Sequence, residues 1–473
     1  MIQFHSAKEV LTFCKERKIE FIAFYLVDID GRLRNVTIPV ENFSEKTIRQ
    51  GIGFDASNLG FADVEASDMI FKPDLGFGFE DPVDENSGIL YFFCHIFEAK
   101  TGKNFSQDLR HILQKALRAL RAENIADEMK VGVELEFNVL DELYSKLTVR
   151  EISYALRSIE LASPPDGREL YRLASNRGYY RAEPNDHLFS IRNEIVRALK
   201  KLHVKVKYHH HEVGSSQSEI EFCFLPVEFA ADATVLAKNI SHRIARKHEK
   251  VVSFLPKLIP GEAGNGMHVH QFLLKEGKNI FDDSNGLYHL SQTALFYLGG
   301  ILKHAGSLLA LTNPTTNSYR RLVPGFEAPV KAVFAEGNRS AAIRIPAYVQ
   351  DPQERRIEFR TIDATCNPYL AYAAMAMAGL DGIRNRIDPI KEGFGPIEKS
   401  LYELKEEELK KITSFPDSLE SALQCLKEDH AYLVHKNVFP VGLIEKWIAV
   451  KTQDIEEMRR IPHPWEVARY YDI

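Results

Sequence analysis

Cysteine and tryptophan are scarce in this sequence. The 473 residues include five cysteines and two tryptophans, and the cysteines are scattered, odd in number and without the spacing of a metal-binding motif. Disulfide-rich secreted proteins carry closely spaced cysteines in even number, so that class is excluded. The cysteine pattern fits a reducing compartment, and we expect a cytoplasmic protein.

The sequence also lacks a secretory signal and a long apolar run. Its first residues show no cationic segment followed by an apolar one, so we expect no signal peptide. The longest apolar-looking run, residues 369–380, is too short and too rich in small residues to span a bilayer. We therefore expect no membrane partner, and we expect this run to form a buried helix that begins at Asn367-Pro368.

Basic charge is not in excess. There are 60 lysines and arginines against 66 aspartates and glutamates, which gives a net charge of −6. This balance offers no electrostatic case for a nucleic-acid partner. The G-x-x-x-x-G-K-[ST] motif and the protein-kinase motifs are absent as well, so a nucleotide site in this chain would have to be of another kind.

The periodicity of apolar residues changes near residue 105. The preceding residues are rich in strand-like runs, and Asp30-Gly31 between two of these runs predicts a β-hairpin. From Ser106 onward the period is helical. We therefore predict an α+β protein with a small N-terminal domain, residues 1–105, and a larger domain, residues 106–473. Long helices are predicted in the larger domain at residues 189–202, 227–248, 288–311, 366–385, 416–428 and 441–460.

Four short strand-like segments of the larger domain carry charged or histidine side chains at alternate positions. Side chains at positions i and i+2 share one face of a strand. In a single segment such a face most simply meets water. Four segments together indicate a concave binding face, because clustered charges leave solvent only when ions or opposite charges compensate them. The same-face sets are Glu134 and Glu136, Glu219 and Glu221, His268 and His270, and Arg356, Glu358 and Arg360.

The candidate metal ligands are mostly carboxylates. Oxygen ligands with a single imidazole form a hard set that favours Mg²⁺ or Mn²⁺ over zinc. Two cations are predicted, because Mg²⁺ keeps waters and usually takes one or two carboxylates. The consecutive histidines 209–211 do not predict a zinc site, because neighbouring strand residues point to opposite faces. The candidate ligands are Glu134, Glu136, Glu212, Glu219, Glu358 and His268.

The stretch of residues 313–344 adds cationic side chains to this picture. Two prolines and a glycine within residues 324–329 predict a bent loop that holds Glu327. Guanidinium groups offer a planar fork of donors to phosphate or carboxylate. Beside a face that binds metal ions, such arginines indicate phosphoryl transfer, where positioning and electrostatics supply most of the rate. The candidates here are Arg321, Arg339 and Arg344.

Several long motifs resemble those of type I glutamine synthetase. Among them are GVELEF (132–137), GNGMHVHQ (264–271), LTNPTTNSYRRLVPGFEAPV (311–330) and NRSAAIRIP (338–346), and the likeness runs nearly end to end. The resemblance implies an N-terminal β-grasp domain and a catalytic domain with a curved antiparallel sheet flanked by helices. It also implies an enzyme that uses ATP to join ammonium to the γ-carboxylate of L-glutamate through γ-glutamyl phosphate.

The resemblance assigns two metal sites and the substrate contacts. Glu219 is preferred to Glu221 as a ligand because Gln217 precedes it. The metal sites correspond to Glu136, Glu212 and Glu219, and to Glu134, His268 and Glu358. The nucleotide contacts correspond to His270, Arg339, Arg344, Arg356 and Phe224, and the glutamate contacts to Asn265, Gly266, Arg321 and Arg360. The ammonium pocket corresponds to Asp55, Tyr179 and Glu212, where a carboxylate binds the cation and accepts its proton.

Further implications concern closure, modification and assembly. Glu327 matches a flap that closes over the intermediate, and Tyr402 aligns with a tyrosine that some members adenylylate, although an ordinary surface tyrosine is the simpler interpretation. The family forms a homododecamer of two hexameric rings with active sites between subunits, so Asp55 would serve a neighbouring subunit's site. Lys207 and Phe272 stand where the family commonly has an acidic residue and a serine, which alters the expected adenine contacts.

Two alternatives stay open from the sequence. One is a ligase of the same fold that uses another amine, and the other is a non-catalytic structural or regulatory relative. The three residues of the ammonium pocket are all present, which favours ammonia over another amine. The metal ligands and Glu327 are also present, which argues against a non-catalytic relative.

Overall fold

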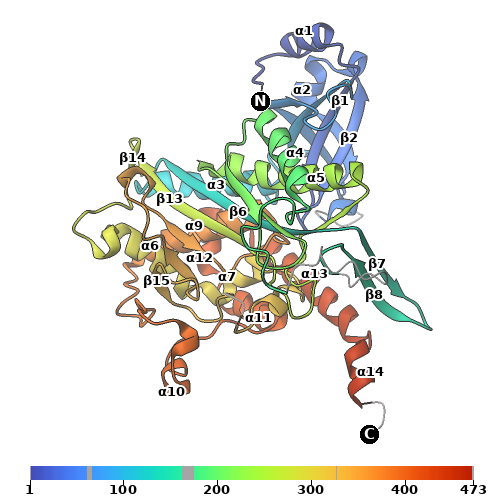
Figure 1. Cartoon of the computed structure of the whole chain (residues 1–473). Coiled ribbons are helices and arrows are strands. Elements are labelled where there is room, and N and C mark those ends of the chain that lie inside the picture. Colours follow the sequence, from blue (N-terminus) through green and yellow to red (C-terminus); the bar gives the residue numbers. More distant parts are fainter. Residues whose placement is uncertain (1, 61–66, 162–174, 326–327, 471–473) are drawn as a thin grey trace.

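The computed structural model describes residues 2–60, 67–161, 175–325 and 328–470. A five-stranded sheet in the order β2-β1-β5-β4-β3 forms the N-terminal part, which lies at the upper end of the view in Figure 1. The β1–β2 pair is the antiparallel hairpin predicted at Asp30-Gly31, and β1 pairs with β5 in parallel. The strands are β1 (Phe21–Val27), β2 (Leu33–Pro39), β3 (Ile52–Asp55), β4 (Asp68–Glu80) and β5 (Ile89–Glu98), accompanied by helices α1 (Ala7–Arg17) and α2 (Glu45–Gln50).

Helix α3 (Leu109–Ala122) follows the N-terminal sheet, as the change of period predicted. Its apolar face is buried, with Ile112, Leu113 and Ala116 at its centre. Arg110 at its start is ion-paired with Asp74 of β4 at 3.1 Å and with Asp232 of helix α5 (Val227–Lys247) at 2.8 Å. Because a buried arginine needs opposite charge, this triad ties the N-terminal sheet to the rest of the chain.

A ten-stranded sheet occupies the larger part of the chain. Its main path is β15-β16-β17-β13-β6-β10-β9, with β11, β12 and β14 paired at its sides. The pairs are antiparallel except β15–β16, which is parallel. The bounds are β6 (Glu128–Leu140), β9 (Val206–His211), β10 (Gln217–Phe222), β11 (Leu225–Pro226), β12 (Val251–Ser253), β13 (Met267–Lys275), β14 (Lys278–Asn279), β15 (Phe334–Glu336), β16 (Ile343–Ile345) and β17 (Ile357–Phe359).

Helices pack against this sheet and against one another (Figure 1). The apolar run of residues 369–380 lies in α9 and is buried, as predicted. Gly300 allows α6 and α9 to approach closely. A Cβ on this residue would lie 2.1 Å from the carbonyl oxygen of Ala378. The helices are α4 (Phe189–Lys201), α5 (Val227–Lys247), α6 (Gln292–Lys303), α7 (Ala305–Thr312), α8 (Ser318–Arg321), α9 (Pro368–Asn385), α10 (Glu406–Leu409), α11 (Leu419–Glu428), α12 (Ala431–Val434), α13 (Val441–Arg459) and α14 (Pro464–Tyr470).

The prediction of a single helix over residues 288–311 is wrong. The chain forms two helices, α6 and α7, that meet at His304 with a bend of 75°. The ring of His304 lies between Asp381 of α9 and Asp429, which follows α11, and these contacts hold the junction. In the described part of the chain, no single helix has the length and apolar character of a membrane span, and α6 and α7 reach them only when taken together across their bend.

Two elements project from the body in Figure 1. One is the hairpin of β7 (Glu142–Leu147) and β8 (Ile152–Arg157), and the other is the C-terminal helix α14. Short 3₁₀ turns lie at Val40–Asn42, Ser57–Leu59, Leu287–His289, Pro352–Glu354, Leu401–Glu403 and His435–Asn437.

Candidate active site

The four charged strands are neighbours in the large sheet. Glu136 lies opposite Glu219 across the β6–β10 pair, and Glu134 lies opposite both Glu221 of β10 and His268 of β13. His270 of β13 in turn lies opposite Glu358 of β17. Side chains opposite each other on one face of antiparallel strands are close enough to interact. The alternation in the sequence therefore predicted correctly that these charges face one another.

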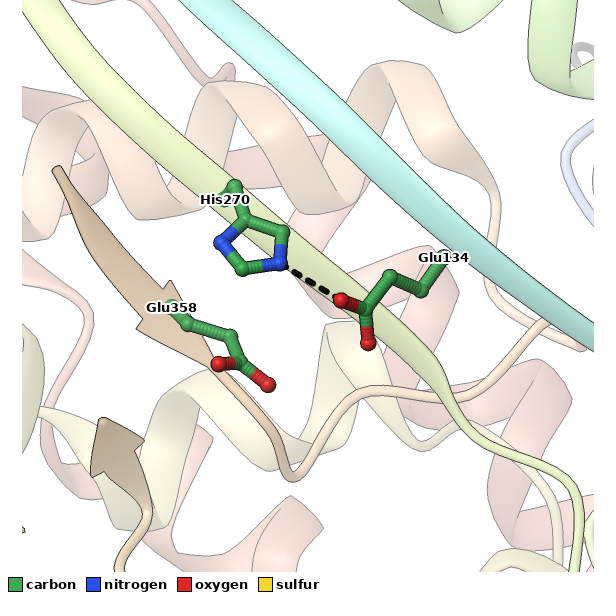
Figure 2. A group of neighbouring side chains, drawn as sticks. All are labelled: Glu134, His270 and Glu358. Carbon is green, nitrogen blue, oxygen red and sulfur yellow. Dashed lines mark hydrogen bonds and ion pairs between the residues drawn. The ribbon is translucent and has the colours of Figure 1, made fainter. Parts of the chain in front are cut away.

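One compact group of possible metal ligands spans three strands. Glu134, His270 and Glu358 each offer a ligand atom, and these atoms lie within 4.8 Å of one another. Figure 2 shows the three side chains converging from β6, β13 and β17, with His270 Nε2 2.7 Å from Glu134 Oε1. His268, the predicted ligand, is also close: its Nδ1 lies 2.8 Å from Glu134 Oε2 and 3.9 Å from Glu358 Oε1.

A second group of possible metal ligands lies at strands β9 and β10. His210, Glu212 and Glu219 offer ligand atoms within 4.8 Å of one another. Glu136, predicted for this site, accepts a hydrogen bond from the Gly266 backbone N–H at 2.7 Å. His210 was not predicted, although it stands two residues before Glu212 and shares its face by strand alternation.

A third group consists of Glu134, Glu219 and Glu221, again with ligand atoms within 4.8 Å. Glu221 is 3% exposed and is ion-paired with Lys207 Nζ at 2.7 Å. The lysine ammonium thus supplies positive charge to this part of the cluster. Lys207 stands where the family commonly has an acidic residue, and its pairing with Glu221 was not predicted.

Burial and mutual repulsion set the pKa values of the carboxylates. Burial, followed by the charges of Glu136 and Glu219, raises the pKa of Glu212 well above its usual range. Burial and the nearby Glu134 and Glu136 raise the pKa of Glu219 in the same way. Burial also acts to raise the pKa of Glu134, but the charges and hydrogen bonds of His270 and His268 outweigh it and hold that pKa well below its usual range. Carboxylates that repel one another in this way are suitable ligands for a hard divalent cation. The charge of the cation would offset their repulsion.

Arginines surround Glu358, which is fully buried. Arg344 Nη1 donates to Glu358 Oε2 at 2.6 Å, and Arg360 Nη1 donates to Oε1. Burial alone would raise the pKa of Glu358, but these cations, the charge of Arg360 foremost, lower it to about 2. Arg321 donates to the Thr361 carbonyl at 2.7 Å and to His268 Nε2 at 3.3 Å. The site therefore carries charges of both signs.

Most of these side chains line a cavity of about 780 Å³. Most predicted site residues lie on its wall, together with Tyr180, Lys207, Tyr208 and Tyr348, which were not predicted. Tyr348 lies in no periodic pattern that would mark it as a site residue. The predicted residues on the wall are Glu134, Glu136, Tyr179, Glu212, Glu219, His268, Arg321, Arg339, Arg344, Glu358 and Arg360.

The other predicted residues lie behind the wall or away from it. Arg356 packs over the rings of Phe224 and Tyr348, at 5.2 and 5.6 Å, and its Nε donates to His270 Nδ1 at 3.4 Å. Asn265 is buried and donates to Asn138 Oδ1 at 2.7 Å.

Asp55 ends β3 in the N-terminal sheet, where it accepts a hydrogen bond from Ser57 Oγ at 2.7 Å, and it is not part of this cavity wall. Glu327 and the side chain of Tyr402 lie outside the described residues.

Together these features bring carboxylates and histidines whose ligand atoms lie close enough to share metal ions to one cavity, with arginines beside them. The family models for "Glutamine synthetase, catalytic domain" and "Glutamine synthetase, beta-Grasp domain" match residues 106–470 and 18–99. The chain belongs to the glutamine synthetase family.

Curated relatives and a solved structure agree along the whole chain. Glutamine synthetase of Frankia alni is 40% identical over 479 residues, covering 99% of this chain and 100% of the relative. Glutamine synthetase of Aquifex aeolicus is 40% identical over 475 residues, covering 99% of each chain. The structure of Plasmodium falciparum glutamine synthetase superimposes with a TM-score of 0.88 at 27% identity, covering 99% of each chain.

Proposed function

We propose that this enzyme joins ammonia to the γ-carboxylate of L-glutamate at the expense of ATP, forming L-glutamine, ADP and phosphate. The observation that carries the proposal is the convergence of carboxylates, histidines and arginines on one cavity in a chain of this family. The γ-carboxylate first takes the γ-phosphoryl group of ATP, and the resulting γ-glutamyl phosphate then reacts with ammonia. Phosphate leaves as the new carbon–nitrogen bond forms.

Two Mg²⁺ or Mn²⁺ ions are proposed for the carboxylate face. One would be held by Glu134, His268 and Glu358, and the other by Glu136, Glu212 and Glu219. The donor set supports the proposal, because oxygen ligands with one imidazole suit these cations better than zinc. When bound, the ions would neutralise phosphate oxygens of the nucleotide and of the transferring phosphoryl group.

The arginines and the nearby aromatic side chains provide for the two anionic substrates. His270, Arg344 and Arg356 are proposed to contact nucleotide phosphates, with Phe224 beside them. Arg339 is proposed to stabilise the transferring phosphoryl group, since a guanidinium donates two parallel hydrogen bonds to it. Arg321, Arg360, Asn265 and Gly266 are proposed to hold glutamate.

We place the ammonium-binding part of the site, the amine end, at Tyr179 and Glu212, which both line the cavity. A carboxylate beside a bound ammonium stabilises the cation and then accepts its proton, leaving neutral ammonia as the nucleophile. Asp55 is proposed to complete this pocket from a neighbouring subunit, which agrees with its not being among the residues that line the cavity of its own chain. Glu327 is proposed to close over the acyl phosphate and limit its hydrolysis.

The proposal also covers the assembly of the subunits and the location of the protein in the cell. We propose a homododecamer of two hexameric rings in the cytoplasm, where five free cysteines fit the reducing conditions. The division into residues 1–105 and 106–473 and the adenylylation of Tyr402 stay predictions.

A panel of amines tests the function. The purified protein is incubated with glutamate, ATP and Mg²⁺ or Mn²⁺, and phosphate release is measured with ammonium, methylamine or a polyamine. We expect turnover with ammonium and equal amounts of phosphate and glutamine. Arg339→Ala should lose this turnover, whereas Arg118→Ala, an exposed control on α3, should keep it. Turnover with a polyamine and none with ammonium would refute the proposal.

A further inference from the structure

A buried histidine–glutamate pair lies directly behind the amine end of the site. His211 is the last residue of β9, and Glu160 lies three residues beyond the end of β8. His211 Nε2 lies 3.1 Å from Glu160 Oε2, and the two side chains are 0% and 1% exposed. Neither residue lines the cavity, so neither is available to touch a substrate there.

The other ring nitrogen of His211 contacts the backbone of Glu212. His211 Nδ1 lies 2.7 Å from the Glu212 carbonyl oxygen. A carbonyl oxygen and a carboxylate oxygen both accept hydrogen bonds, so each of these ring nitrogens can donate to its neighbour when it carries a proton. The contact fixes the main chain of Glu212, whose carboxylate faces the cavity.

Glu160 also holds the turn between β9 and β10. Its Oε2 accepts a hydrogen bond from the Ser216 backbone N–H. That turn leads from Glu212 to Glu219, and the Glu212 backbone N–H donates to the Gln217 carbonyl at 2.9 Å across it. One buried carboxylate therefore contacts both the histidine before Glu212 and the turn before Glu219.

The segment that carries Tyr179 packs against the backbone of residues 211–213. The Gly178 N–H donates to the Val213 carbonyl at 3.0 Å, and the Tyr180 N–H donates to the His211 carbonyl at 3.1 Å. A Cβ on residue 178 would lie 2.4 Å from the Glu212 carbonyl oxygen and 2.5 Å from His211 Nδ1. Only glycine permits this approach, so Tyr179 and Glu212 are held in register through His211.

We propose that Glu160 and His211 are positioning residues that fix the Glu212 carboxylate relative to Glu219 and Tyr179. The inference rests on the proposed function, in which Glu212 holds a metal ion and binds the amine. A buried histidine–carboxylate contact is weak evidence for stability, so the role of this pair lies in the geometry it imposes. Partners that orient a metal ligand typically change metal affinity by about 10 to 100-fold when removed.

The test uses the full-length protein and Mn²⁺ alone, with binding followed by electron paramagnetic resonance. In Glu160→Ala, we expect one Mn²⁺ site to weaken by about 10 to 100-fold while the other keeps its affinity. Glu160→Gln should stay close to wild type, because its amide oxygen accepts from Ser216 while its NH₂ donates to His211 Nε2. Glu194→Ala removes a Glu–His pair of 2.7 Å between α4 and His248, which follows α5, and neither residue lines the cavity, so this variant should have no effect.

Two results would overturn the inference. One is wild-type Mn²⁺ affinity at both sites in Glu160→Ala, and the other is an equal loss in Glu160→Ala and Glu160→Gln. If Glu160→Ala does not fold, Glu160→Asp decides in the same assay, because it keeps the charge but withdraws the carboxylate from His211. Glutamine formation by the wild-type protein is measured in parallel. Its failure would count against the proposed function, whereas the Mn²⁺ affinities alone decide the positioning role.

Discussion

We predict that the junction of α6 and α7 loses stability at alkaline pH, because it contains a buried histidine held by two aspartates. His304 Nε2 lies 3.0 Å from Asp381 Oδ2, and His304 Nδ1 lies 2.9 Å from Asp429 Oδ2. The ring also stacks on Tyr432, with centroids 4.1 Å apart. Burial alone would lower the pKa of His304, but the hydrogen bonds and charges of the two aspartates outweigh it and raise the pKa to about 9.

The size of the effect follows from the difference between folded and unfolded pKa values. An unfolded histidine has a pKa of about 6.5, and each pKa unit corresponds to about 1.36 kcal/mol. A folded pKa of about 9 therefore contributes about 3 kcal/mol to the free energy of unfolding. Because the folded value is the higher one, this contribution is complete below the unfolded pKa and is lost as the pH rises through about 9.

Urea denaturation at a fixed protein concentration, repeated between pH 6 and pH 10, measures this contribution. We expect the free energy of unfolding of wild type to fall by about 3 kcal/mol more than that of His304→Gln over this range. The difference between the two proteins isolates His304 from other groups that titrate. Parallel curves for wild type and variant across the whole range would refute the reasoning.

Two further predictions concern the carboxylate cluster. Lys207→Met should lower the free energy of unfolding by about 1 to 2 kcal/mol, because it leaves the buried Glu221 carboxylate without its cation. Adding Glu221→Gln should restore most of that loss in urea denaturation, and equal losses in the single and double variants would contradict the ion-pair argument. Glu219→Gln should weaken Mn²⁺ binding more than tenfold by calorimetry, whereas Glu221→Gln should change it less than threefold, because Glu221 is bound to Lys207. The reverse order would show that Glu221 is the ligand.

The sequence predicted the charged face well because strand geometry is local. Alternation alone places Glu134 beside Glu136 and His268 beside His270, and the burial of one face then requires these strands to meet. Helix α3 was predicted for the same reason, since its apolar residues recur with the helical period over its whole length. Such patterns can be recognised within a short stretch of sequence, without knowledge of distant contacts.

What the sequence did not predict depends on contacts between distant segments. Glu160 and His211 are 51 residues apart, and no pattern around Glu160 marks it as a partner of the site. The break at His304 was missed because the apolar residues continue through it, while the aspartates that hold it lie on other elements. His210 is the exception, because its i, i+2 relation to Glu212 is visible in the sequence.

An isotope-transfer experiment tests the central claim most directly. L-Glutamate labelled with ¹⁸O in its γ-carboxylate is converted with ATP, a divalent cation and ¹⁵N-ammonium, and the products are examined by mass spectrometry. If the γ-carboxylate is phosphorylated and ammonia then displaces phosphate, each phosphate released carries one ¹⁸O and each glutamine carries ¹⁵N in its amide. Phosphate without ¹⁸O, or ATP cleavage without labelled glutamine, would contradict the account.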